Sequence, residues 1–271
     1  MANDNFEFIP TLWAGAVLKA LQKKTVFASL CNTDYIGEVK KGNSLKIATI
    51  ANPTVSEYVK GTDIEYEDID GAEQTLNIDQ QKYFAFKVED IDKVQSSIPL
   101  IESTTEGAGY ALADDFDVYL STIIASNGTA KTIEADSKYK AVALIAKLLD
   151  DEKAPDVGRW LVMPTDFATD LLLEATGKLT NNNDVVTSGY LGSLFGLNLF
   201  KSPNVNKPTY GHVSAITTAS QIDETESIRL ENSFASGIRG LHVYGAKVTR
   251  SKLCGVVTVT APQEEPQDEG D

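Results

Sequence analysis

One stretch of this sequence, residues 81–126, constrains the fold more than any other, because it predicts an extended strand that leads into a long helix. Phe84, Phe86 and Val88 recur at every second position, so they share one face of a strand. Beyond Pro99 the apolar residues recur at every third or fourth position, as on one face of a helix: Ala108, Leu112, Phe116, Tyr119, Leu120 and Ile123. An arm-like segment precedes this strand and helix, and a compact domain follows them.

The composition permits a substantial core and argues against some functions. The 271 residues are 42% hydrophobic, which suffices for one large or two modest domains. The formal net charge of -15 argues against a surface that grips nucleic acid, because phosphate binding needs clustered Lys and Arg. No apolar run approaches the ~20 residues of a membrane span, and Met1 to Asp4 lack the features of a secretion signal. The sequence therefore predicts no membrane partner.

The two cysteines, Cys31 and Cys254, lie far apart and belong to no spaced motif. They are interpreted as buried thiols of a protein made in a reducing, cytosol-like compartment, with a disulfide or a reactive thiol as the alternative.

The segment before the strand predicts a short helix followed by a β-ribbon. Thr11 can cap a helix whose apolar stripe includes Trp13 and Val17. The pattern does not decide whether this stripe packs on the chain's own core or on a neighbouring subunit. From residue 35 to residue 79, short alternating runs punctuated by Gly and Pro predict a ribbon that is polar on one side and thinly apolar on the other.

A two-stranded ribbon is marginally stable alone in water, so this one needs a surface to lie on. The alternative is an ordinary sheet layer of a globular domain. Within the ribbon, Asp63, Glu65 and Glu67 alternate on one face, which is typical of a solvated edge strand. A calcium loop with Gly71 at its sixth position would place Tyr66 at the first ligand position, so no metal site is predicted.

The remainder predicts a mixed α+β domain. Tyr139 to Leu149 has helical periodicity, Trp160 to Met163 is a continuous apolar run typical of a buried strand, and Pro164 opens another helix. Residues 189–203 predict a short helical turn, a glycine break and a strand. Further strands are expected at 212–217, 227–230, 241–244 and 254–260, and an acidic, flexible tail at the end.

No catalytic motif emerges. His212 and His242 are the only histidines and are interpreted as ordinary strand residues, and the chain has neither a nucleophile elbow nor a phosphate-binding glycine loop. Asp114, Asp115 and Asp117 are closely spaced, but on a helix they would point in different directions and are expected to face solvent. The sequence thus predicts no cofactor and no enzyme activity.

Several segments, in order, resemble the major capsid proteins of tailed bacteriophages, the family with the HK-97-like fold. They are Asn32-Thr33-Asp34-Tyr35-Ile36-Gly37-Glu38-Val39, Gly42-Asn43-Ser44-Leu45-Lys46-Ile47, the run from Ile78 to Asp92, Trp160-Leu161-Val162-Met163-Pro164, and residues 189–203. The stretch from Tyr83 to Asp92 is the clearest.

The resemblance implies an anatomy for the chain. Its parts are an N-terminal arm with a short helix (1–33), an extended β-hairpin loop (34–80), a peripheral domain with a long spine helix (81–137), an axial domain (138–250), a returning strand of the peripheral domain (251–261) and an acidic flexible tail (262–271). The ribbon would then lie over an adjacent subunit.

The resemblance also implies a function. The chain would self-assemble through pentamers and hexamers into an icosahedral shell that encloses double-stranded DNA without sequence-specific binding, in a virion assembled in the host cytoplasm. A separate scaffolding protein, a portal and a decoration protein are implied partners. Inter-subunit contacts are expected at Trp13, Val17, Leu45, Ile47, Val55, Tyr58, Ile64 and Tyr66. The alternatives are an encapsulin-like compartment shell or, less favoured, a soluble α+β enzyme without a recognisable motif.

Overall fold

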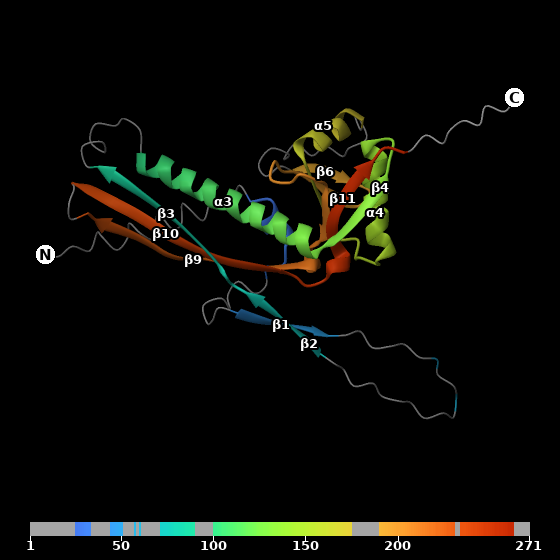
Figure 1. Ribbon diagram of the computed structural model, residues 1–271, viewed down its shortest axis with the longest axis horizontal. Coiled ribbons are helices and arrows are strands. Elements are labelled where there is room, and N and C mark those ends of the chain that lie inside the picture. Colours follow the sequence, from blue (N-terminus) through green and yellow to red (C-terminus); the bar gives the residue numbers. More distant parts are fainter. Residues whose placement is uncertain are drawn as a thin grey trace.

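The computed structural model describes residues 25–33, 44–50, 57, 60, 71–89, 100–174, 190–230 and 234–262. These residues form the mixed α+β architecture that the sequence predicted, and Figure 1 shows an elongated molecule. Its elements are η1 (Phe27–Leu30), β1 (Ser44–Ile50), β2 (Gly71–Asn77), β3 (Gln80–Glu89), α3 (Leu100–Asn127), β4 (Thr129–Glu134), α4 (Lys138–Asp151), β5 (Arg159–Met163), α5 (Thr165–Glu174), β6 (Tyr190–Leu194), β7 (Leu197–Lys201), β8 (Thr209–His212), η3 (Val213–Ala215), β9 (Ile216–Arg229), β10 (Ala235–Val248), η4 (Ser251–Leu253) and β11 (Cys254–Thr260).

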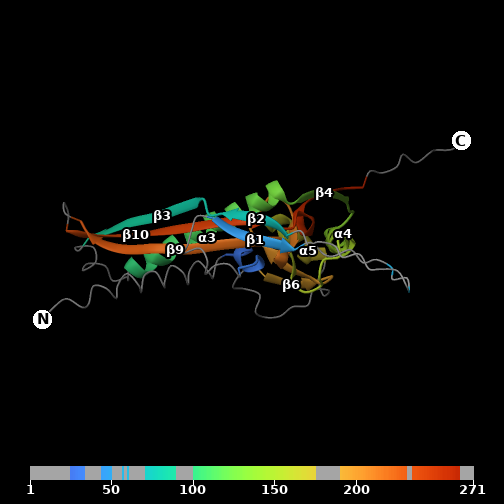
Figure 2. The ribbon, with the colours of Figure 1, turned by 90° about the horizontal axis from the view of Figure 1, so that it is seen from below.

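The predicted strand and long helix are confirmed as β3 and α3, and they form one end of the molecule. β3 is the edge of an antiparallel sheet in the order β3-β10-β9, and α3 runs along this sheet (Figures 1 and 2). Phe84 is half-buried and its ring lies over Gly240, where a Cβ would be 2.4 Å from the ring. Gly240 therefore provides the space for this aromatic side chain. Phe116 of α3 packs edge-on against Tyr244 of β10, with ring centroids 4.9 Å apart.

Gly107 lies in the exposed first half of α3, where a Cβ would meet nothing within 4 Å. Gly107→Ala should therefore raise the free energy of unfolding of the subunit by about 0.5–1 kcal/mol, because alanine loses less backbone entropy in a helix. Gly128→Ala, just past the same helix, is the contrasting variant, since its Cβ would lie 2.6 Å from the Ile124 carbonyl oxygen. Chemical denaturation should show stabilisation only for the first, and destabilisation by Gly107→Ala would contradict the open environment.

The other end of the molecule is a six-stranded sheet in the order β4-β11-β8-β5-β7-β6. All five residues of β5 are buried, as the continuous apolar run predicted. Both predicted helices are present as α4 and α5, and Ser137 caps α4 by accepting a hydrogen bond from the Lys140 N–H. At the start of β5, Arg159 donates to Asp150 at 2.6 Å and to the Ala154 carbonyl at 2.6 Å, which ties the end of α4 to the sheet.

The late part of the chain differs from the sequence prediction in several places. The strand expected at 212–217 is wrong, because the 3-10 turn η3 separates the end of β8 from the start of β9. Residues 190–194, expected as a helical turn, form strand β6, which pairs with β7 through a two-residue turn. Phe195 and Gly196 both have positive φ, at 50° and 76°, as a type I′ hairpin turn requires. The strands expected at 227–230 and 241–244 overlap β9 and β10, but these strands are much longer than expected, with 14 residues each. The strand expected at 254–260 is confirmed as β11.

Strand pairing also divides the chain differently from the expected boundaries. Residues 138–250 were expected to form one unit, but β9 and β10 join β3 in the three-stranded sheet. β11, expected to return to the unit of residues 81–137, pairs with β4 of that unit and with β8, both in the six-stranded sheet. β11 packs in this sheet because Val257 is fully buried in the main core and Gly255 lets the backbone lie close to Thr129.

Candidate functional site

The described part of the predicted ribbon is an antiparallel pair, β1 and β2, in continuous register from Ser44↔Asn77 to Ile50↔Gly71. Its inner face carries Leu45, Ile47 and Leu76, which are 8%, 6% and 0% exposed. They form a small cluster with Ile78, Ala219 and Val243, separate from the main core. The outer face is polar, with an exposed ion pair between Lys46 and Glu73. The base of the ribbon therefore rests on β9 and β10 of its own chain.

This packing bears on the inter-subunit contacts expected from the sequence. Leu45 and Ile47 are already covered within the chain, so they have little side-chain area left for a neighbour. Their contact with another subunit stays a prediction. The remaining expected contacts, Trp13, Val17, Val55, Tyr58, Ile64 and Tyr66, lie outside the described residues.

The ribbon is held to the body at a close backbone approach. A Cβ on Gly245 of β10 would lie 2.2 Å from the Asn77 carbonyl oxygen and 2.9 Å from the Ile78 Cα. Only glycine allows the β2–β3 junction to sit so near β10. Two side chains strengthen the attachment: Lys247 donates to the Thr75 carbonyl at 2.8 Å, and Gln74 donates to the Thr249 carbonyl at 3.3 Å. The sequence did not reveal this site, because the position of a glycine along the chain does not show which distant backbone segment will pack against it.

A second attachment fixes the segment 25–33 against α3 and β9. The Asp117 carboxylate accepts hydrogen bonds from the backbone N–H of Val26 at 2.8 Å and of Phe27 at 3.1 Å. The Phe27 ring packs edge-on against Trp160, 6.0 Å away. Asn32 exchanges backbone hydrogen bonds with Ile216 and Thr218. The segment 25–33 is therefore held in a fixed position by α3, β5 and β9.

All three aspartates were expected to face solvent, and this prediction is wrong for Asp117, whose side chain is buried and only 2% exposed. Burial raises its pKa to about 7, and repulsion from Asp114 adds to this, whereas the backbone hydrogen bonds oppose it. Its spacing could have signalled this position, because Asp117 lies four residues after Ala113 and three before Leu120, on the apolar face of α3. Asp114 is exposed, and Asp115 accepts a hydrogen bond from the Tyr244 hydroxyl.

The histidines are strand residues, as predicted. His212 is the last residue of β8, and His242 lies in β10, 1% exposed, beside Phe116 and Tyr244. Burial lowers the pKa of His242 to about 4. Both cysteine thiols are buried and free, as favoured from the sequence. Within the part of the chain that the structure describes, no group of His, Cys, Asp and Glu could hold a metal ion.

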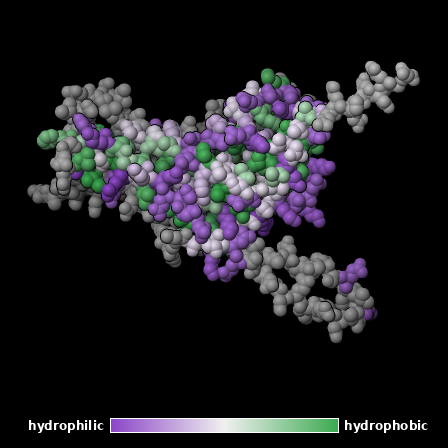
Figure 3. Space-filling view, in the orientation of Figure 1, coloured by the Kyte–Doolittle hydropathy of each residue, from purple (hydrophilic) through white to green (hydrophobic). Residues whose placement is uncertain are grey.

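Large apolar side chains are exposed near both ends of the molecule. Figure 3 shows apolar surface interspersed with polar surface over the outer end of the three-stranded sheet. The most exposed are Val157 (87%), Phe234 (84%), Tyr83 (78%) and Leu173 (73%). Among the described helices, none combines the length and the apolar character needed to cross a membrane.

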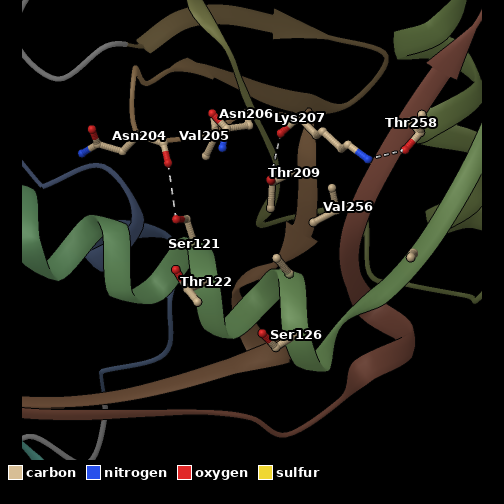
Figure 4. Close-up of a pocket in the computed structure, with 12 residues that line it drawn as sticks. Ser121, Thr122, Ser126, Asn204, Val205, Asn206, Lys207, Thr209, Val256 and Thr258 are labelled. Carbon is tan, nitrogen blue, oxygen red and sulfur yellow. Dashed lines mark hydrogen bonds between the residues drawn. The ribbon is translucent and has the colours of Figure 1, made fainter.

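One pocket, of about 440 Å³, lies between the second half of α3, the loop before β8 and strands β4 and β11 (Figure 4). Seven of its twelve described lining residues carry a hydroxyl or an amide in the side chain. Lys207 reaches across it and donates to the Thr258 hydroxyl at 3.0 Å. This arrangement can bind a polar group, but it has no histidine, cysteine or carboxylate among the described lining residues to act as a nucleophile or a general base.

Comparisons with known proteins find similarity to phage capsid proteins. The family model for phage capsid protein matches residues 72–259. A solved structure from Mycobacterium phage Che8 is similar at 33% identity and a TM-score of 0.70, covering 87% of this chain and 91% of that one. The capsid structure of cyanophage P-SCSP1u is similar at 16% identity and a TM-score of 0.67, covering 89% of each chain. No curated protein matches the sequence.

A virus-like particle from Pyrococcus furiosus is similar at 13% identity and a TM-score of 0.62, covering 94% of this chain and 100% of that one. At this identity the likeness concerns the fold alone. The family match spans more than half of the chain, and the 33% identity extends over most of it. This chain therefore belongs to the phage capsid protein family and has the HK-97-like fold of a tailed-phage major capsid protein.

Proposed function

We propose that this major capsid protein builds its shell through pentamers and hexamers, with the β1–β2 ribbon of each subunit extending over a neighbour, and that the shell encloses double-stranded DNA. The observation that carries the proposal is the ribbon. Its base has its own small core on β9 and β10, while its outer face is polar. In Figure 1 the ribbon lies beside the three-stranded sheet and diverges from it toward Ile50 and Gly71. A ribbon anchored at one end can present its other end to a second subunit.

Association by such contacts needs no catalytic chemistry. Identical subunits joined by heterologous contacts close into rings and then into a shell. Each stable contact is expected to bury about 1,000–2,000 Å². The exposed Phe234, Tyr83 and Val157 supply apolar area for contacts with neighbouring subunits. The net charge of -15 suits a container whose DNA must slide past the wall.

A compartment shell that holds protein cargo is the second candidate, since it would share the fold. The 33% identity to the Che8 phage chain, against 13% to the Pyrococcus furiosus particle, favours the phage capsid. A scaffolding protein, a portal and a decoration protein are the expected partners, and the host cytoplasm is the expected place of assembly. Purified particles that contain a protein cargo and no DNA would favour the second candidate.

Replacement of residues 51–70 by an Asn-Gly turn tests the role of the ribbon. Because Ile50 and Gly71 are paired, a two-residue turn can connect them and leave Leu45, Ile47 and Leu76 in place. We expect the subunit to unfold cooperatively like the parent chain but to form no closed shells by size-exclusion chromatography and negative-stain microscopy. Deletion of residues 42–70 would be a less clear test, because it would also remove β1 and would not separate an effect on folding from an effect on assembly.

Lys46→Ala is the matched control, because it changes the ribbon only at an ion pair whose side chains are 72% and 62% exposed. Solvent and salt screen such exposed pairs, which therefore contribute little to stability, so shells should form normally. Normal shells from the shortened ribbon would refute its proposed role, and loss of folding would instead favour an ordinary sheet layer.

A further inference from the structure

The polar pocket of Figure 4 differs from the rest of this acidic protein in its charge. The chain contains 39 Asp and Glu residues, yet none of the described residues that line the pocket is acidic, and Lys207 is the only charged one. A pocket without acidic groups and with one cation is electrostatically suited to an anion. Its other polar side chains carry hydroxyls and amides, which can donate hydrogen bonds to the oxygens of a carboxylate.

Lys207 is placed to receive such a group. One of its three N–H bonds is directed to Thr258 at 3.0 Å, which holds the ammonium group over the pocket and leaves its other donors for a ligand. Among the described residues it forms no ion pair with a carboxylate. Around it, Thr122 donates its hydroxyl to the Val118 carbonyl, so the oxygen lone pairs of Thr122 and not its proton face the site. The cation is therefore the main anchor.

The chain itself carries a segment of the required chemistry. Residues 263–271 contain Glu264, Glu265, Asp268, Glu269 and Asp271 and no Lys or Arg. This segment follows directly from β11, whose Val256 and Thr258 line the pocket. Pro262 is four residues beyond Thr258, a distance of roughly 13 Å along a strand. Asp268 is six residues further, with a reach of roughly 20 Å, which exceeds the return distance.

We propose that the pocket between α3 and β11 is a docking site for a carboxylate of the acidic segment 263–271, held by Lys207. Charge complementarity and reach carry the assignment. Docking would place this segment against α3 instead of leaving five negative charges to repel the rest of an acidic surface. The same chain supplies the carboxylate, because the segment continues directly from β11, which lines the pocket.

Disulfide trapping in the full-length chain tests the proposal. Ser126→Cys places a thiol in the pocket and keeps Lys207, and Asp268→Cys places one in the segment. The native thiols, Cys31 and Cys254, are buried and should not react. Under mild oxidation, Ser126→Cys with Asp268→Cys should cross-link about five-fold faster than a matched pair outside the pocket, because one partly exposed ion pair enriches the docked state by about that factor.

Lys131→Cys with Asp268→Cys is the matched pair. Lys131 is exposed and lies opposite Val257 of β11, which is next to Thr258 of the pocket lining, but Lys131 itself does not line the pocket, whereas its neighbour Ala130 does. Successive strand residues face opposite sides, so Lys131 points away from it. The preference should disappear when Lys207→Gln is added, and it should shrink at high salt, where screening acts within a few ångströms.

Mixing chains that carry only Ser126→Cys with chains that carry only Asp268→Cys separates the sources. Docking within a chain predicts cross-linking in the double variant and no cross-linked dimer from the mixture, so a cross-linked dimer would indicate docking between copies and contradict the proposal. Equal rates for the pocket and control pairs, or no effect of Lys207→Gln, would overturn the proposal. The measurement works on unassembled subunits as well as shells, so a failure to assemble would count against the proposed function and not against the docking site.

Discussion

Gly245→Ala is expected to reduce the yield of closed shells at least ten-fold while leaving a folded subunit. The added Cβ would lie 2.2 Å from the Asn77 carbonyl oxygen, so the β2–β3 junction must move. A seven-residue strand is roughly 23 Å long, so a tilt of about 10° at the base displaces the end of the ribbon by roughly 4 Å. Such a displacement would remove the ribbon from its position on a neighbour.

The body should tolerate this change. The ribbon cluster is separate from the main core, so the cost is limited to overpacking at one junction, about 1–3 kcal/mol. Circular dichroism and chemical denaturation should show a cooperative subunit, and negative-stain microscopy should show few or no shells.

Gly237→Ala is the matched control on the same strand. Its Cβ would meet the Leu230 side chain at 3.5 Å, an ordinary contact, and shells should form at the parent yield. If Gly245→Ala also assembled normally, the close approach would not determine the direction of the ribbon, and its attachment would depend on Lys247 and Gln74 instead.

The second prediction concerns two buried groups whose effects on stability oppose each other between about pH 5 and pH 6.5. Asp117 has a folded-state pKa of about 7, above its unfolded value near 3.8, so its contribution to stability is lost as the pH rises toward 7. His242 has a folded-state pKa of about 4, below its unfolded value of 6.5, so its contribution is lost as the pH falls below 6.5. In this range the native state holds the proton on Asp117, and the unfolded state holds it on His242.

These two contributions nearly cancel in the parent chain, and single variants should reveal them. With Asp117→Asn, the free energy of unfolding should increase with pH, by about 1–2 kcal/mol from about pH 5 to about pH 6.5. With His242→Phe, which retains an aromatic ring beside Phe116 and Tyr244, it should decrease by a similar amount. The double variant should again show little dependence on pH.

Chemical denaturation of unassembled subunits at several pH values measures these slopes. Asp117→Asn also leaves one backbone N–H of the segment 25–33 without its acceptor, but that cost is independent of pH and does not alter the slope. If the free energy of unfolding changed with pH in the same way in the parent chain, both single variants and the double variant, neither group would have the shifted pKa that its burial implies.

The local elements were largely determined by the sequence. The alternation of Phe84, Phe86 and Val88, the periodicity of α3 and α4, the apolar run of β5 and the bounds of β11 are all present as predicted. Each of these elements depends on apolar residues that recur at every second position in a strand, or at every third or fourth position in a helix. This spacing lies within one segment and determines which face is buried independently of the rest of the chain. The order of the quoted segments was also sufficient to indicate the capsid family.

Tertiary structure alone decided the contacts between distant segments. Asp117 became a buried anchor because the Val26 and Phe27 N–H groups, about ninety residues earlier, meet it. Leu45 and Ile47 found their partners on β9 and β10, and Lys207 faces a pocket formed by four separate elements. The run 190–194 is too short for its period to distinguish helix from strand, so pairing with β7 determined it. Such contacts depend on which surfaces the folded chain brings together, and no periodicity within one segment encodes that.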